Sequence, residues 1–81
     1  GLRYVRDDEP GIYRKGRGKG FCYVDDRGHL IRNPTVLKRI SELVIPPAWT
    51  SVWICKQANG HIQATGRDGR DRKQYLYHKE W

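Results

Sequence analysis

Apolar residues recur at helical spacing in only one part of the chain, just before a pair of prolines. Val36, Leu37, Ile40, Leu43 and Val44 fall at positions that form one stripe of a helix. Asn33 is a favourable N-cap, and Pro34 suits the first helical position. The helix must end by Ile45, because Pro46-Pro47 cannot continue it. The pattern predicts one helix over residues 34–44, with the charged residues Lys38, Arg39 and Glu42 on its solvent side.

Polar and apolar residues alternate with a period of two on both sides of this helix, which predicts strands. Before the helix, residues 21–25 and 29–31 flank a turn and predict a hairpin. After it, residues 51–57 are apolar on both faces, as is typical of a central strand. Asn59-Gly60 then signals a tight turn into a strand over residues 61–65, and residues 72–78 complete a meander.

These elements predict an α+β fold, a mainly antiparallel sheet of about five strands with one main helix packed on one face. The helix can cover only one face, so we expect the other face to stay open. Side chains assigned to the shared core are Leu37, Ile40, Leu43, Val52, Ile54, Ile62 and Leu76. Side chains expected on the open face are Gln63, Thr65, Tyr75 and Tyr77.

The first 19 residues predict a basic, glycine- and arginine-rich arm that is partly disordered, followed by a folded domain over residues 20–81. Residues 11–20 hold four cations and four glycines but no acid. Glycine raises the entropy cost of ordering, and little apolar surface offsets that cost. The arm either contacts a nucleic-acid backbone or is a solvated leader. Leu2, Tyr4, Val5 and Ile12 indicate that part of it docks on the domain.

Composition narrows the choice of partner more than it narrows the fold. The 81 residues hold 16 Lys and Arg against 9 Asp and Glu, a net charge of +7 that favours a polyanion. No apolar run approaches the roughly 20 residues of a membrane span, and no signal peptide is visible, so we expect a cytoplasmic protein that makes no membrane contact. We also expect a monomer. The two cysteines and three histidines lack metal-ligand spacing, so no metal or other cofactor is expected. Cys22 and Cys55 are interpreted as reduced thiols, although a disulfide between them stays open.

Residues 66–78 combine an arginine-rich turn with a tyrosine-rich strand. Asp68-Gly69 favours a tight turn, and in the strand Lys73, Tyr75 and Tyr77 share one face while Gln74, Leu76 and His78 share the other. Cations that meet phosphates, beside rings that meet bases or sugars, are typical of a nucleic-acid surface. The alternatives are a self-neutralising loop and an ordinary strand with structural tyrosines. The candidate DNA-binding residues are Arg67, Arg70, Arg72, Lys73, Gln74, Tyr75 and Tyr77.

Several segments resemble the N-terminal domain of bacterial type IB DNA topoisomerases, which are close to the small poxvirus-type enzymes. The most specific part is residues 45–78, with Pro46-Pro47-Ala48-Trp49 and the later Arg72-Lys73-Gln74-Tyr75, and residues 1–12 and 20–25 fit too. The resemblance implies a five-stranded sheet that lies on the major-groove side of duplex DNA. It also implies that the Gln-Tyr-x-Tyr strand contacts bases and backbone, which restores Gln74 as a contact although local geometry points it away.

The resemblance places the chemistry in a C-terminal domain that would follow residue 81. There a tyrosine forms a 3′-phosphotyrosyl link and relaxes supercoils without ATP, so the parent protein is expected to be an isomerase. We expect this chain alone to carry no catalytic residue and to be inert, with the catalytic domain and double-stranded DNA as its partners. Two other functions stay open: a free-standing RNA- or single-strand-binding domain with an aromatic stacking face, and a protein-interaction or structural domain.

Overall fold

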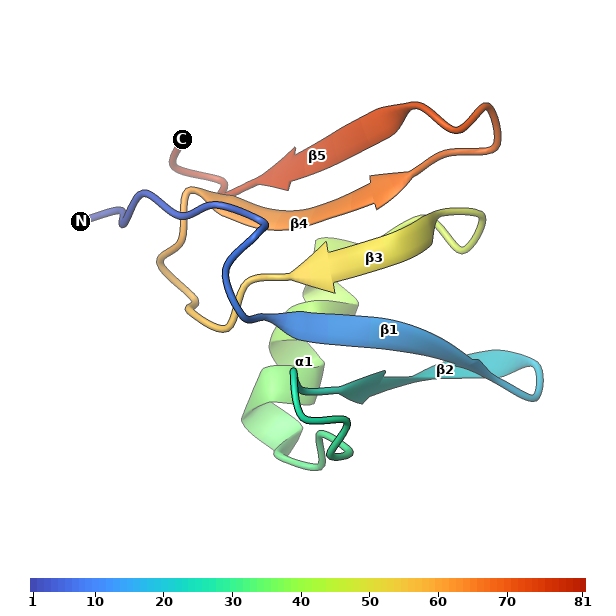
Figure 1. Ribbon diagram of the computed structural model, residues 1–81. Helices are drawn as coiled ribbons and strands as arrows, with labels where there is room; N and C mark the ends of the chain where they lie inside the picture. Colours follow the sequence, from blue (N-terminus) through green and yellow to red (C-terminus); the bar gives the residue numbers. More distant parts are fainter.

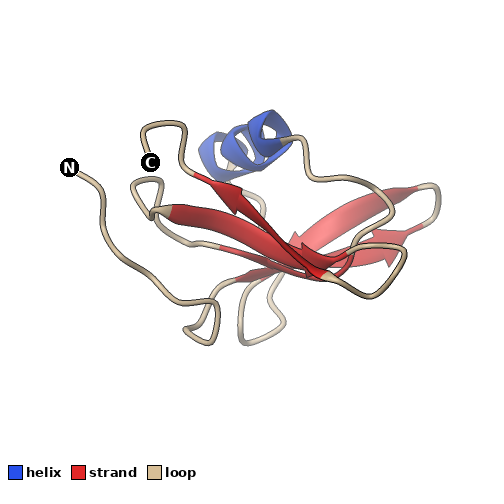
Figure 2. Cartoon of the chain, turned by 90° about the horizontal axis from the view of Figure 1, so that it is seen from above, coloured by secondary structure: helices blue, strands red, loops and turns tan.

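The computed structural model describes residues 1–81 and contains one sheet and one helix (Figure 1). The elements are β1 (Ile12–Arg17), β2 (Gly20–Val24), α1 (Pro34–Leu43), β3 (Thr50–Ile54), β4 (Ile62–Arg67) and β5 (Lys73–Tyr77). The five strands lie in the order β2-β1-β3-β4-β5, and every neighbouring pair is antiparallel. Figure 2 shows α1 on one side of this sheet. The α+β prediction is therefore confirmed.

The first strand lies where the sequence predicted a poorly ordered arm. Residues 12–17 form β1, which pairs with β2 on one side and β3 on the other. The second short strand expected at residues 29–31 is absent, and only an isolated bridge joins Leu30 to Val24. The glycines of this stretch obscured β1 in the sequence, because Gly16 lowers the strand propensity within it, whereas Gly18 lies in the β1–β2 turn with φ 57°. The predicted number of five strands was right, but β1 takes the place of the strand expected at residues 29–31.

The sheet carries an apolar cluster on each face, because β3 is central and apolar on both sides. Ile12, Ile40, Val52, Ile54 and Ala64 form the cluster under α1, with Leu43 and Leu76 packed against it. Val5, Trp53 and Cys55 form the second cluster on the opposite face. Ile62 packs there rather than in the predicted core, because the β4–β5 register shifts between Ile62 and Ala64. Cys22 and Cys55 are free thiols.

Helix α1 begins at Pro34 as the sequence predicts and ends at Leu43, one residue before the predicted end at Val44. Asn33 accepts hydrogen bonds from the backbone N–H groups of Thr35 and Val36 at 2.9 and 3.3 Å. Val44, expected on the apolar stripe, takes a left-handed conformation with φ 52° and is 78% exposed. The chain leaves the helix there, so Val44 never reaches the sheet.

Arg39, expected in solvent, instead joins α1 to the β3–β4 connection. Its guanidinium donates to Gln63 Oε1 at 2.6 Å and to the carbonyl of Cys55 at 2.5 Å. Gln63 Nε2 in turn donates to the Gly60 carbonyl at 2.8 Å. Gln63 was predicted on the open face but is buried on the helix side, because the register shift turns it there. Burial lowers the pKa of Arg39, although hydrogen bonds occupy its donors.

Residues 1–10 pack against the sheet instead of leading away from it. Arg3 forms a parallel bridge with Gly60, and the backbone N–H of Val5 donates to His61 Nδ1 at 3.1 Å. Further along, Trp53 Nε1 donates to the Glu9 carbonyl at 2.9 Å. Gly11 must be glycine, because a Cβ there would lie 2.2 Å from Trp53 Nε1. This segment, including the buried Val5, covers part of the face opposite α1.

Helix α1 has 10 residues. No helix of the structure is both long and apolar enough to cross a membrane.

Candidate nucleic-acid interface

The hairpin tips β1–β2 and β4–β5 lie at the same end of the sheet (Figure 1). The register places this end at the pairs Arg17–Gly20, Thr50–Arg67 and Arg67–Lys73. Neighbouring strands lie about 4.8 Å apart, so β1 and β5, three spacings apart, are separated by roughly 14 Å. Side chains without a carboxylate partner at this end are those of Lys15, Arg17, Lys19, Arg67 and Arg70. The fold thus joins the basic stretch of the predicted arm to the arginine-rich turn, two segments about 50 residues apart in sequence.

Arg14, the remaining cation of the predicted arm, has a structural role. Its guanidinium donates to the carbonyl oxygens of Ile45, Pro46 and Trp49 at 3.4, 2.9 and 2.9 Å. It also lies over the ring of Phe21, 4.1 Å from the centroid. Partial burial lowers the pKa of Arg14. This side chain holds the connector between α1 and β3 to the sheet, so Arg14 is not counted among the cations available to bind a phosphate.

Asp68 organises the arginine-rich turn between β4 and β5. Its Oδ1 accepts from the backbone N–H groups of Arg70 and Arg72 at 2.9 and 3.0 Å. Its Oδ2 accepts from Arg72 Nε at 2.9 Å and from Gln74 Nε2 at 3.0 Å. These bonds, first of all those with the backbone of Arg72, lower the pKa of Asp68 to about 2. Arg72 is therefore partly neutralised, whereas Arg67 donates only to the Asp71 carbonyl at 3.3 Å.

Tyr75 and Tyr77 form an exposed pair of parallel rings on β5. The ring centroids lie 6.0 Å apart and the ring planes are inclined by 14°. Tyr75 is 42% exposed and Tyr77 is 50% exposed. Trp81 continues the row 6.4 Å beyond Tyr77. Gln74 lies on the other face, as strand alternation predicts, and Asp68 accepts a hydrogen bond from its amide there. The two tyrosines are thus presented to solvent, and Gln74 is turned towards the arginine-rich turn.

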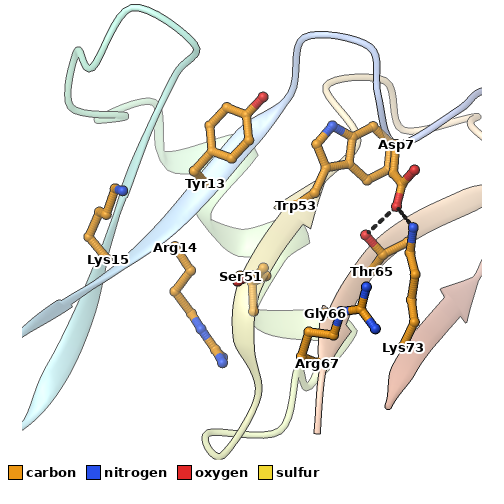
Figure 3. A pocket seen from close by; sticks show the side chains of 11 residues that line it. Asp7, Tyr13, Arg14, Lys15, Ser51, Trp53, Thr65, Gly66, Arg67 and Lys73 are labelled. Atoms are coloured by element: carbon orange, nitrogen blue, oxygen red, sulfur yellow. Dashed lines mark hydrogen bonds and ion pairs between the residues drawn. The ribbon is translucent and has the colours of Figure 1, made fainter. Parts of the chain in front are cut away.

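A hollow of about 370 Å³ lies on the sheet face opposite α1, between β1 and β5 (Figure 3). Residues that line it include Asp7, Lys15, Ser51, Thr65, Arg67 and Lys73. Thr65, predicted in the open, is only 2% exposed because Asp7 covers it. Ser51 has a left-handed φ of 51° at the irregular start of β3, where the β3–β4 register shifts. Hydroxyl and cationic donors therefore surround one concave site.

Asp7 and Lys73 form an ion pair inside this hollow. Lys73 Nζ lies 2.5 Å from Asp7 Oδ2, and the same oxygen accepts from Thr65 Oγ1 at 3.0 Å. Partial burial works against the charge of Asp7, but the bonds from Lys73 and Thr65 outweigh it and lower its pKa. The bond to Asp7 raises the pKa of Lys73. Sequence reasoning found Lys73 but missed Asp7, because 66 positions separate the two and no local pattern joins them.

The residues predicted from the sequence therefore fall into separate groups. Lys73, Tyr75 and Tyr77 share the face opposite α1, and Arg67 and Arg70 extend it at the end of the sheet. Arg72 and Gln74 meet at Asp68 instead. Lys15, Arg17 and Lys19 were treated as part of a disordered arm and join the same end through β1 pairing. Their charge was visible in the sequence, but their position was not.

The architecture defines a small α+β domain with a basic end and an exposed aromatic strand. The family described as "Bacterial DNA topoisomerase IB, N-terminal domain" matches residues 20–68. The chain is also 42% identical, over 69 residues, to a protein of Acanthamoeba polyphaga mimivirus called DNA topoisomerase 1B. That match covers 85% of this chain and 20% of the relative. The chain belongs to the family of N-terminal domains of bacterial type IB DNA topoisomerases, which confirms the resemblance seen in the sequence. It spans about a fifth of the length of the viral relative.

Proposed function

We propose that the chain is the DNA-clamping domain of a type IB DNA topoisomerase and that it binds duplex DNA from the major-groove side. Its contact surface is the exposed β5 face together with the basic end of the sheet. A separate C-terminal domain of the same protein then forms the 3′-phosphotyrosyl intermediate and relaxes supercoils. This chain contributes binding and carries no step of the chemistry. DNA and that catalytic domain are its partners.

The observation that carries the proposal is the joining of two basic hairpin tips at one end of the sheet, beside exposed tyrosines. Phosphates recur on both strands of a duplex, so cations about 14 Å apart can meet more than one of them. Tyr75 and Tyr77 offer phenol groups and ring faces next to those cations. Family membership supports the same assignment.

Binding of the 81-residue chain to a fluorescent duplex of about 20 base pairs, measured by anisotropy over a salt series, tests the proposal. We expect weak binding with little sequence preference, and a log–log salt slope of about −0.9 for each phosphate contact. Salt-independent or undetectable binding would refute the proposal. Stronger competition by single-stranded DNA or RNA than by duplex would instead favour a single-strand stacking domain.

A plasmid assay separates binding from chemistry. The chain alone is expected neither to nick nor to relax supercoiled plasmid, because no side chain hydrogen-bonds to the Tyr75 or Tyr77 hydroxyl to activate it as a nucleophile. Covalent attachment of this chain to DNA, detected by gel shift after denaturation, would contradict the assignment of catalysis to the other domain.

A further inference from the structure

An anion already occupies the hollow on the sheet face, and it belongs to the protein itself. The Asp7 carboxylate takes one hydrogen bond from a hydroxyl, Thr65 Oγ1, and one from an ammonium, Lys73 Nζ (Figure 3). A phosphate oxygen of a nucleic-acid backbone accepts from the same kinds of donor. Asp7 thus shows which anion chemistry these two donors can satisfy.

Further donors line the hollow without a carboxylate of their own. Arg67 and Lys15 stand on its two sides, on β4 and β1, and neither has an acidic partner. Ser51 contributes a hydroxyl from the start of β3. The site therefore holds more positive charge than the single carboxylate of Asp7 offsets. Such an excess suits a phosphodiester that is one of a series of charges along a strand.

Asp7 can leave these donors without unfolding its segment. The chain is fixed before it by the Arg3–Gly60 bridge and after it by the bond from Trp53 Nε1 to the Glu9 carbonyl. The Asp7 and Lys73 side chains remain 27% and 37% exposed, so the pair is open to solvent on one side. Rotation of one side chain is enough to free Lys73 and Thr65.

We propose that this hollow is a backbone-phosphate subsite that Asp7 fills in the free domain, and that a DNA phosphate displaces the Asp7 carboxylate on binding. The inference rests on the proposed DNA-binding function and adds a named site and a built-in competitor to it. Lys73 and Thr65 receive the phosphate, with Arg67 and Lys15 beside it. Asp7 lowers the affinity for every duplex, because each binding event must first break its ion pair.

The test is the variant Asp7→Asn, which keeps the side-chain shape and removes the competing charge. We expect it to bind the labelled duplex about two- to fivefold more tightly than the parent, since an exposed ion pair contributes little. Asp8→Asn is the matched control, because it removes the same charge from the next residue along the chain. Asp8 pairs with Arg6 and does not line the hollow. An equal gain in both variants would reduce the effect to net charge and overturn the inference.

The dependence on Lys73 gives a second measurement. In a Lys73→Gln background, Asp7→Asn is expected to change duplex affinity much less, because the displaced partner is already gone. An Asp7→Asn gain that persists unchanged without Lys73 would overturn the subsite. So would a lower melting temperature of Asp7→Asn with unchanged affinity, which is the signature of a structural ion pair.

Labelled wild-type protein gives a readout that does not depend on any variant. Adding duplex should shift the 13Cγ resonance of Asp7, with a smaller change at Asp8. An unshifted Asp7 under saturating duplex would overturn the inference while leaving the proposed DNA-binding function intact. If wild-type and variants all fail to bind duplex, both the subsite and the proposed function fall.

Discussion

Asp68 holds Arg72 by both its backbone and its side chain: the backbone N–H lies 3.0 Å and Nε 2.9 Å from the Asp68 carboxylate. This pairing bends the chain between β4 and β5 and fixes where the surrounding cations point. Asp71 adopts a left-handed conformation in the turn, with φ 59°, and its backbone N–H donates to the Asp68 carbonyl at 2.9 Å. The turn is therefore built around one acid, although its composition is dominated by arginine.

Acid titration should report on this organisation directly. The pKa of Asp68 is lowered from 3.8 to about 2, so the carboxylate stabilises the folded turn above the unfolded pKa. That stabilisation is lost as the pH falls through about 2. We expect the amide resonances of Arg70 and Arg72 to titrate with a midpoint near 2. In Asp68→Asn this transition should vanish. A midpoint near the ordinary 3.8 would show that the turn is not held by these bonds.

The two arginines at the ends of the turn should differ in their effect on binding. Arg67 lacks a carboxylate partner, whereas Asp68 already neutralises part of the charge of Arg72. We expect Arg67→Ala to weaken binding to all duplexes alike and to flatten the log–log salt slope by about 0.9. Arg72→Ala should change the slope less. Anisotropy over a salt series measures both.

Arg27→Ala is the matched control for these variants. Arg27 lies in the turn after β2, at the opposite end of the sheet from the hairpin tips, and its loss changes the net charge equally. Its salt slope should stay close to that of the parent. If Arg27→Ala and Arg67→Ala flatten the slope equally, binding depends on overall charge and the turn is a solvated loop.

How far the sequence could predict this molecule depends on the range of the interactions involved. Local signals were sufficient for α1, where Asn33 and Pro46 mark the ends, and for the face that carries Tyr75 and Tyr77. The sequence did not predict β1, because its glycine-containing half is ordered by pairing with β2 and its first residues, Ile12 and Tyr13, pair with the distant β3. The prediction that Gln63 lies on the open face was wrong, because a register shift turns its side chain towards the helix side. No local sequence pattern reveals such a shift.

The candidate site was found by composition and corrected by topology. The cations of the turn and the two tyrosines could be identified as candidate contacts from residue type and local spacing alone. Lys15 joins them only through the antiparallel pairing of β1 with β3. Asp7 enters the site because Val5 and Trp53 pack together and bring the N-terminal segment over the sheet. Both contacts are long-range, and period-two or helical spacing contains no information about them.

Arg39 should contribute to stability in a way that its neighbours on α1 do not. Arg39→Leu removes the donor to Gln63 Oε1 and to the Cys55 carbonyl, leaving partly buried acceptors unpaired. Such a loss costs about 1–3 kcal/mol of unfolding free energy. Lys38→Leu, on the exposed side of the same helix, should change stability by less than about 0.5 kcal/mol. Urea denaturation compares the two, and equal values would mean that the Arg39 bonds are not formed in solution.

The tyrosine pair permits the cleanest separation of binding from packing, because Tyr→Phe keeps the ring and deletes only the hydroxyl. Tyr75 and Tyr77 are 42% and 50% exposed, and no hydrogen bond to another residue holds either phenol. Loss of the hydroxyl therefore breaks nothing in the free protein, and both variants should melt within about a degree of the parent. In complex with duplex, each hydroxyl that donates to a phosphate or a base edge contributes about 0.5–1.5 kcal/mol. We expect each variant to weaken duplex binding by that amount, measured by anisotropy at one fixed salt concentration.

In a longer chain that carries the catalytic domain, the same changes should slow DNA cleavage without abolishing it, because they loosen the clamp and leave the chemistry untouched. Variants that bind like the parent but melt earlier would make the face structural, and the contact surface would then be confined to the two basic hairpin tips.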